Sequence, residues 1–325
     1  MSTEIGDILK YFRDEKKYTV SQIEALSNIS SRQIHRIDNN TYKSNINTIS
    51  ALCKSLKIYV GSYADVIIHF NSKEQYKRYQ EIKRYIEHKN ISKLKTLLSK
   101  SSDEKILSLD YSAYKQIIFL GKAYIAFYGN NEDNKALDYC FYALNTTEYD
   151  FEKAHKESFL GYESSYAVFN LMAVIYAKKS KYKNSKTLLD LIINSMRSHY
   201  SSETIPCFMI PMSVYRNYII ANNSLASLYL EKGNYIFAKE ICQSLINFCI
   251  ENDFSYDLET SYKILFKITY AEEINNVEPA ICIGIKAILH AKHKRNQCFV
   301  DEFCYDVLQH YPLAYTKLKY YSDFF

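Results

Sequence analysis

The chain has 325 residues, a formal net charge of +5 and 47% hydrophobic residues. Its length predicts about two domains. Only seven Gly and four Pro favour long helices over many-turned sheets. No stretch of about 18 apolar residues and no signal or transit pattern is present, so we expect a cytoplasmic protein without a membrane partner.

Motif searches exclude several function classes. The sequence has no Gly-rich phosphate loop, no GxSxG and no HExxH, so we do not expect an enzyme. Eight cysteines are scattered without a CxxC pair or a nearby His cluster. We therefore expect mostly reduced, buried thiols, no metal site and no cofactor.

The first 60 residues predict a compact group of short helices. Ile5, Ile8, Leu9 and Phe12 recur at helical spacing and indicate a first helix with one apolar stripe. Thr19 with Gln22, and Ser30 with Gln33, have the spacing of capping boxes, in which a hydroxyl accepts from a backbone N–H at the helix start.

A tight turn separates the two helices that these caps begin. The three residues 27–29 leave room for nothing longer, and Asn28 tolerates a left-handed backbone. The next helix is expected over 31–38, with Ile34 and Ile37 inward and the polar residues outward. Asn39 and Asn40 would end it. A fourth amphipathic helix follows, with apolar residues Ile46, Ile49, Leu52, Cys53 and Leu56.

The segment from Ile29 to Asn40 resembles the turn and recognition helix of the XRE/Cro-repressor family. The resemblance implies a five-helix helix-turn-helix domain over residues 1–71 that places its third helix in the major groove of double-stranded DNA. Arginine can contact guanine O6 and N7 together, and hydroxyls can bind phosphate. The DNA-binding residues implied are Thr19, Ser30, Ser31, Arg32, Gln33 and Arg36.

Three departures weaken the match to the family pattern, and the one at Glu24 leaves the register of the second helix open by one residue. Val20 stands where Gln is common, and Glu24 stands where a small residue is usual, with Ala25 next to it. Asn28 and Asn40 replace the usual glycines. The alternative is an ordinary helical bundle with charges on its solvated face.

Basic residues are concentrated in the N-terminal part. Residues 1–100 carry 18 Lys and Arg against 10 Asp and Glu, which suits a polyanion-binding end. Part of this charge lies just beyond the helix-turn-helix, at Lys73, Lys77, Arg78, Lys83, Arg84 and Lys89. These residues either contact flanking phosphates or form a solvated helix face.

Internal sequence repeats indicate the structure of the chain beyond the N-terminal domain. The segment from Asn170 to Tyr176 matches that from Asn223 to Tyr229, and the residues that follow match at the same offset of 53 residues. Large, small and aromatic positions alternate as in the tetratricopeptide repeat. We therefore expect an all-α chain with a tetratricopeptide-like α-solenoid over 72–325. A further helix pair is expected over about 74–100, and a terminal cap from about 297.

The first helix of each repeat would line a concave face. An Asn there can donate to and accept from an extended peptide backbone, and an Arg can hold a carboxylate. The peptide-binding residues expected on this basis are Glu163, Tyr166, Asn170, Arg216, Ile220, Asn223, Ser227 and Leu230. An Asn on a helix is also compatible with simple solvent exposure.

Together the two parts resemble the RRNPP group, the peptide-responsive regulators of the Rgg, PlcR and PrgX type. The resemblance implies a homodimeric, quorum-sensing transcription regulator that binds an operator and a short signalling peptide. One alternative is a helix-turn-helix repressor whose repeats bind a protein partner. Another is a repeat protein that inhibits or dephosphorylates a signalling partner, as Rap-type proteins do, which would leave the N-terminal pattern without a role.

Overall fold

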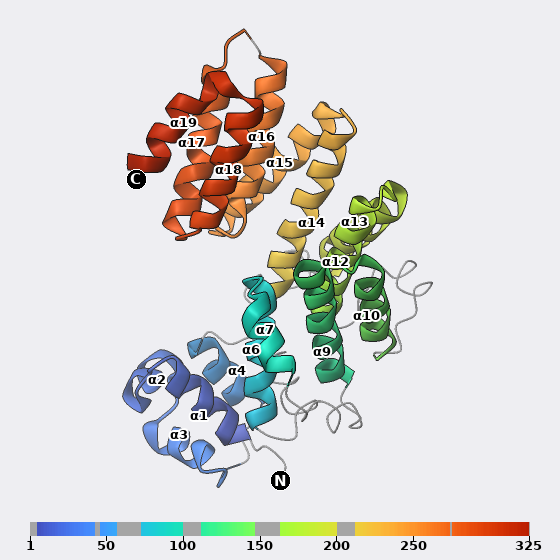
Figure 1. Cartoon of the computed structure of the whole chain (residues 1–325). Helices are drawn as coiled ribbons and strands as arrows, with labels where there is room; N and C mark the ends of the chain where they lie inside the picture. The colour runs from blue at the N-terminus through green and yellow to red at the C-terminus, as the bar shows by residue number, and fades with distance from the viewer. Residues whose placement is uncertain are drawn as a thin grey trace. The chain divides into compact units, whose positions relative to one another are not determined.

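The computed structural model describes residues 5–42, 46–56, 73–99, 112–146, 163–199, 212–273 and 275–324. Within these ranges the chain consists of helices and turns and has no strand, which confirms the all-α prediction (Figure 1). Two compact units are formed. One comprises Met1–Ile175 with Ser195–Val214, and the other comprises Tyr176–Asn194 with Tyr215–Phe325.

The first unit begins with the predicted helix-turn-helix. Its helices are α1 (Ile5–Glu15), α2 (Val20–Ser27), α3 (Ser31–Asp38) and α4 (Ile46–Ser55). The predicted third helix thus agrees with α3 at both ends. The expected fifth helix and the expected domain boundary at residue 71 lie outside the described residues.

The core of this domain is built from the apolar stripes that the sequence predicted. Leu9, Ile34, Ile37 and Leu52 are at most 3% exposed. Gly6 allows α1 to approach α3, since a Cβ atom there would lie only 1.9 Å from the carbonyl oxygen of Ile37. The Gly6 N–H donates to Asn40 Oδ1 at 2.7 Å, so the close approach is also hydrogen-bonded.

A buried ion pair joins the same two helices. The Arg13 guanidinium donates to the carboxylate of Asp38, the last residue of α3, and their side chains are only 11% and 7% exposed. Arg13 also approaches Asp14 at 3.6 Å, but the Asp14 side chain is 59% exposed. The Arg13–Asp38 pair therefore fixes the end of α3 from inside the domain.

The rest of the first unit contains further helix pairs. They are α6 (Lys73–Glu87) with α7 (Ile91–Leu98), and α9 (Ser112–Tyr124), continued by the π-helical turn η1 (Ile125–Gly129), with α10 (Asp133–Asn145). The first pair confirms the one expected over about 74–100. Its residues Ile82 and Leu94 are fully buried, and a Cβ at Gly121 of α9 would lie 3.5 Å from side-chain atoms of both.

Three helices have residues in both units: α12 (Glu163–Lys178), α13 (Tyr182–His199) and α14 (Met212–Glu231). The second unit continues with α15 (Tyr235–Glu251), α16 (Leu258–Glu272), α17 (Glu278–His293), α18 (Gln297–His310) and α19 (Pro312–Phe324). None of the described helices is long and apolar enough to cross a membrane.

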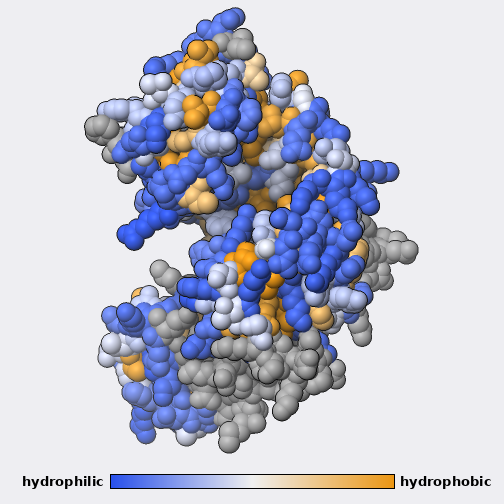
Figure 2. Space-filling model, in the orientation of Figure 1, coloured by the Kyte–Doolittle hydropathy of each residue, from blue (hydrophilic) through white to orange (hydrophobic). Residues whose placement is uncertain are grey.

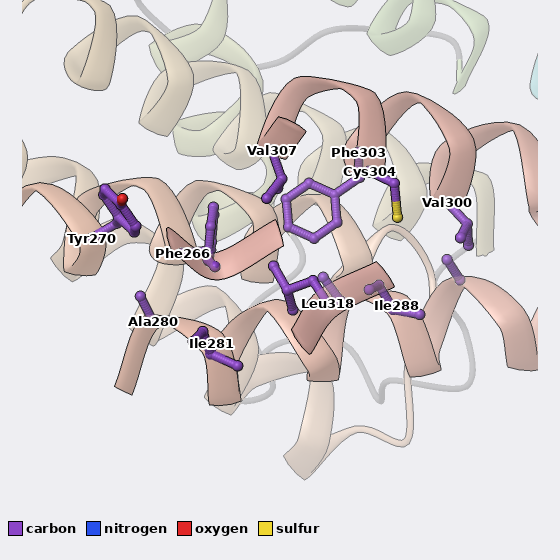
Figure 3. Close-up of a cluster of buried hydrophobic side chains, with 13 residues drawn as sticks. Phe266, Tyr270, Ala280, Ile281, Ile288, Val300, Phe303, Cys304, Val307 and Leu318 are labelled. Carbon is purple, nitrogen blue, oxygen red and sulfur yellow. The ribbon is translucent and has the colours of Figure 1, made fainter. Parts of the chain in front are cut away.

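The predicted terminal cap corresponds to α18 and α19, which pack on α16 and α17. Phe303 lies among Phe266, Val307 and Leu318 in a cluster of buried side chains (Figure 3). The rings of Phe266 and Phe303 meet edge to face at 5.4 Å. Aromatic pairs favour this geometry, so the terminal pair is joined to the repeats by specific packing as well as by burial.

Several turns between paired helices share one construction. Lys89, Gly233 and Arg295 have left-handed backbone angles, with φ of 48°, 73° and 57°. An Asn follows each of them, and its side-chain oxygen accepts from the N–H three residues later. Gly233 and Asn234 thus form the inter-helix turn that the sequence predicted.

Removal of the buried cation tests how α3 is held. Arg13→Ala leaves Asp38 buried without its partner, so the free energy of unfolding of the N-terminal domain should fall by about 3–5 kcal/mol in urea denaturation. Asp14→Asn removes only the exposed partner and should change stability by less than about 1 kcal/mol. Equal losses in the two variants would contradict a special role for the buried pair.

Candidate nucleic-acid interface and repeat-domain site

Local hydrogen bonds determine where α2 and α3 begin. The Thr19 hydroxyl accepts from the Gln22 N–H at 3.2 Å, and the Gln22 side chain accepts from the Thr19 N–H at 2.8 Å, which completes the predicted capping box. Ser30 accepts from the Gln33 N–H at 3.3 Å at the start of α3. Asn28 adopts the expected left-handed conformation, with φ of 56°.

The outward side of α3 is polar, and the visible face over α1–α3 is mainly hydrophilic (lower left of Figure 2). Arg32 and Arg36 are exposed, whereas Ser31 and Gln33 are half-buried. The Arg36 guanidinium lies 5.0 Å from the ring centre of Tyr42, and this cation–π contact favours a position of the guanidinium over the ring. Of the six predicted DNA-binding residues, five therefore lie on α3 or its N-cap, and Thr19 caps α2.

Glu24 is a residue of this site that sequence reasoning did not select. Its carboxylate accepts a hydrogen bond from the Ser31 hydroxyl and one from the Ser31 backbone, and these bonds lower the pKa of Glu24. Ala25 is exposed, whereas Glu24 is half-buried and contacts Ser31, the first residue of α3. The departure from the family pattern at Glu24 was the available signal.

The predicted peptide residues of the first unit lie on α12. Tyr166 is 2% exposed, and its hydroxyl is 2.9 Å from Ser195 Oγ. Asn170 is 4% exposed. Glu163 begins the helix, and its side chain lies outside the described residues. Tyr166 and Asn170 are thus interior residues, which is not the exposed position that a peptide-facing role suggests.

In the second unit the predicted residues follow one face of α14. The half-buried members are Arg216, Ile220, Ser227 and Leu230. The Arg216 guanidinium lies 5.3 Å from the ring centre of Tyr256. Asn223, in the middle of this face, is only 3% exposed, so it differs from its neighbours.

Asn223 is held in a polar network with the start of α16. Its amide nitrogen donates to the backbone oxygen of Asp257 at 3.0 Å and to Asp257 Oδ2 at 2.9 Å. Its amide oxygen accepts from the Ser261 hydroxyl at 2.7 Å. Thr260 donates to the other carboxylate oxygen of Asp257 at 2.7 Å. Desolvation raises the pKa of Asp257, although these hydrogen bonds oppose the shift.

Two solved structures share this architecture over nearly the whole chain. Bacillus thuringiensis PlcR, in complex with the peptide PapR7 and DNA, matches with a TM-score of 0.61 and covers 92% of this chain and 98% of its own, at 11% identity. The apo form of the competence regulator ComR from Streptococcus vestibularis matches with a TM-score of 0.50 and covers 94% and 97%, at 14% identity. The chain has the fold of RRNPP regulators.

The resemblance predicted from sequence is therefore confirmed at the level of fold. No protein-family model and no curated protein matches the sequence. One matched structure is a complex with a peptide and DNA, the other is a competence regulator, and the fold is common to them and this chain. The ligands of this chain do not follow from the fold alone.

The raised pKa of Asp257 predicts a pH dependence of stability. The folded chain keeps this proton at pH values where the unfolded chain has lost it, so stability increases as the pH falls from the folded-state pKa toward the ordinary value. In thermal unfolding, the wild type should gain stability relative to Asp257→Asn as the pH is lowered from 7 to about 4.5.

Asp253 offers a matched control for this measurement. It is exposed and also has a left-handed backbone, with φ of 55°, which Asn tolerates. Asp253→Asn should follow the wild-type pH profile. A constant stability difference between wild type and Asp257→Asn across the same pH range would show that the pKa of Asp257 is not raised in the folded chain.

Proposed function

We propose that the chain is a DNA-binding transcription regulator controlled by a short signalling peptide that its repeat domain binds. The observation that carries the DNA-binding part is the orientation of α3. Ile34 and Ile37 anchor it inward at 3% and 1% exposure, while Arg32 and Arg36 remain exposed. A helix held in this way presents its outer side chains to the major groove.

The proposed regulator acts as a homodimer. Helix-turn-helix dimers read two half-sites separated by one turn of DNA, about 34 Å or a multiple of it. A ligand that changes how two copies pair would therefore change operator affinity. The second unit offers exposed apolar side chains on its terminal helices, with Tyr305 and Leu313 66% and 67% exposed, which is compatible with a protein contact.

The peptide-binding part is supported by the face of α14. Arg216 is a cation near one end of this face, suited to a peptide carboxylate, and Ile220 and Leu230 supply half-buried apolar surface. The same face also suits a folded protein partner, which is the alternative function. A binding experiment with peptides separates the two.

Loss of one arginine tests the DNA-binding proposal. Arg32→Ala should weaken binding to the selected operator by about 1–3 kcal/mol and relax the preference at one base pair, because a bidentate contact is lost. The measurement is a fluorescence-anisotropy titration with operator variants. Arg197→Ala, which removes an exposed arginine of α13, should bind like wild type. Wild-type affinity and preference in Arg32→Ala would remove α3 from the interface.

Thermal stabilisation tests the peptide proposal. A peptide encoded by a short reading frame next to the gene should stabilise the protein by about 2.7 kcal/mol at 100 times its dissociation constant. Arg216→Ala should reduce this stabilisation without changing operator binding. Arg197→Ala again serves as the matched control. If no such peptide stabilises the chain while operator binding is intact, the protein-partner alternative is favoured.

A further inference from the structure

The start of the recognition helix contains an interaction that bears on base selection. Glu24 of α2 accepts hydrogen bonds from both the hydroxyl and the backbone of Ser31, the first residue of α3. Both side chains are half-buried, and Ser31 stands beside the exposed Arg32. The contact therefore joins a half-buried carboxylate of α2 to a residue at the proposed DNA surface.

The chemistry of this contact fixes the direction of the Ser31 hydroxyl. An ionised carboxylate has only acceptor capacity, so the hydroxyl hydrogen must point toward Glu24. The hydrogen bonds from Ser31 lower the pKa of Glu24 and keep it ionised at neutral pH. The Ser31 oxygen then retains lone pairs alone for any further partner. A serine without such a neighbour can donate or accept.

Base edges in the major groove distinguish donors from acceptors. Adenine N6 and cytosine N4 carry amino groups that donate, whereas guanine O6 and N7 and thymine O4 accept. We propose that Glu24 is a specificity-determining residue, which holds Ser31 as an acceptor so that α3 selects an amino-bearing base, adenine or cytosine, opposite Ser31. The inference rests on the proposed DNA-binding function and names what one position of that site recognises.

A purely structural role for Glu24 predicts a different result. If Glu24 only capped α3, its loss would weaken binding to all sequences alike. The backbone N–H of Gln33, the third residue of α3, is capped separately by the Ser30 hydroxyl. In addition, a carboxylate near the phosphates opposes binding to every sequence, so its neutralisation should leave general DNA affinity equal or higher. Under the proposal the loss of Glu24 therefore lowers discrimination without lowering general affinity, whereas a purely structural role lowers affinity for all sequences.

The experiment selects binding sites for the full chain from a random-sequence duplex DNA library. Wild type should enrich adenine or cytosine at one position, and Ser31→Ala should lose that enrichment and no other. Glu24→Gln, which can both donate and accept, should lower the preference at the same position by about fivefold or more while keeping total DNA affinity. Ser31→Thr retains the hydroxyl and should retain the preference.

Asp14→Asn is the matched charge control, since Asp14 is an exposed carboxylate of the same domain and should not alter base preference. Melting curves establish that each variant is folded. Unchanged preferences in a folded Glu24→Gln variant, or equal weakening on all sequences, would overturn the inference while DNA recognition stands. If wild type enriches no sequence, the proposed DNA-binding function itself fails, and the inference fails with it.

Discussion

The outward side chains of α3 are available for recognition because its inward side is held at both ends and in the middle. Ile34 and Ile37 bury the centre, the Arg13–Asp38 ion pair holds the last residue, and the Glu24 carboxylate meets the first. A recognition element that is already ordered loses less conformational freedom on binding. The specificity proposed for Ser31 and Arg32 thus depends on the contacts that hold α3 within the domain and on the Glu24 contact at its first residue.

Features set by neighbouring residues could be predicted from sequence, and features set by packing could not. The Thr19 capping box, the left-handed Asn28 and the bounds of α3 depend on residues within four positions of one another. Arg13 and Asp38 are 25 residues apart, and neither carries a local signal for the other. Ser31 was selected for its position and Glu24 departs from the family pattern, but the hydrogen bond between them is seen only with α2 and α3 placed together.

The repeat domain shows the same division. Matched segments 53 residues apart correctly predicted helix pairs, and Gly233 with Asn234 correctly predicted a turn. The equivalent turns at Lys89 and Arg295 were not predicted. Residues with long side chains rarely adopt a left-handed backbone, so neither residue signals such a turn in the sequence. Their common feature is the following Asn, which caps the next helix. A strained residue is tolerated there since the cap and the paired helices fix the turn.

The polar network of Asn223 bears on which residues of α14 can meet a ligand. A peptide that took the Asn223 amide would first have to replace three hydrogen bonds, two to Asp257 and one from Ser261. Each such bond contributes on the order of 1 kcal/mol net, and an unsatisfied buried group costs about 1–3 kcal/mol. The half-buried Ser227 and Leu230, on the same helix face, carry no comparable penalty in their described contacts. Direct contact is therefore favoured at these positions, and Asn223 is better explained as the link that holds α14 to the start of α16.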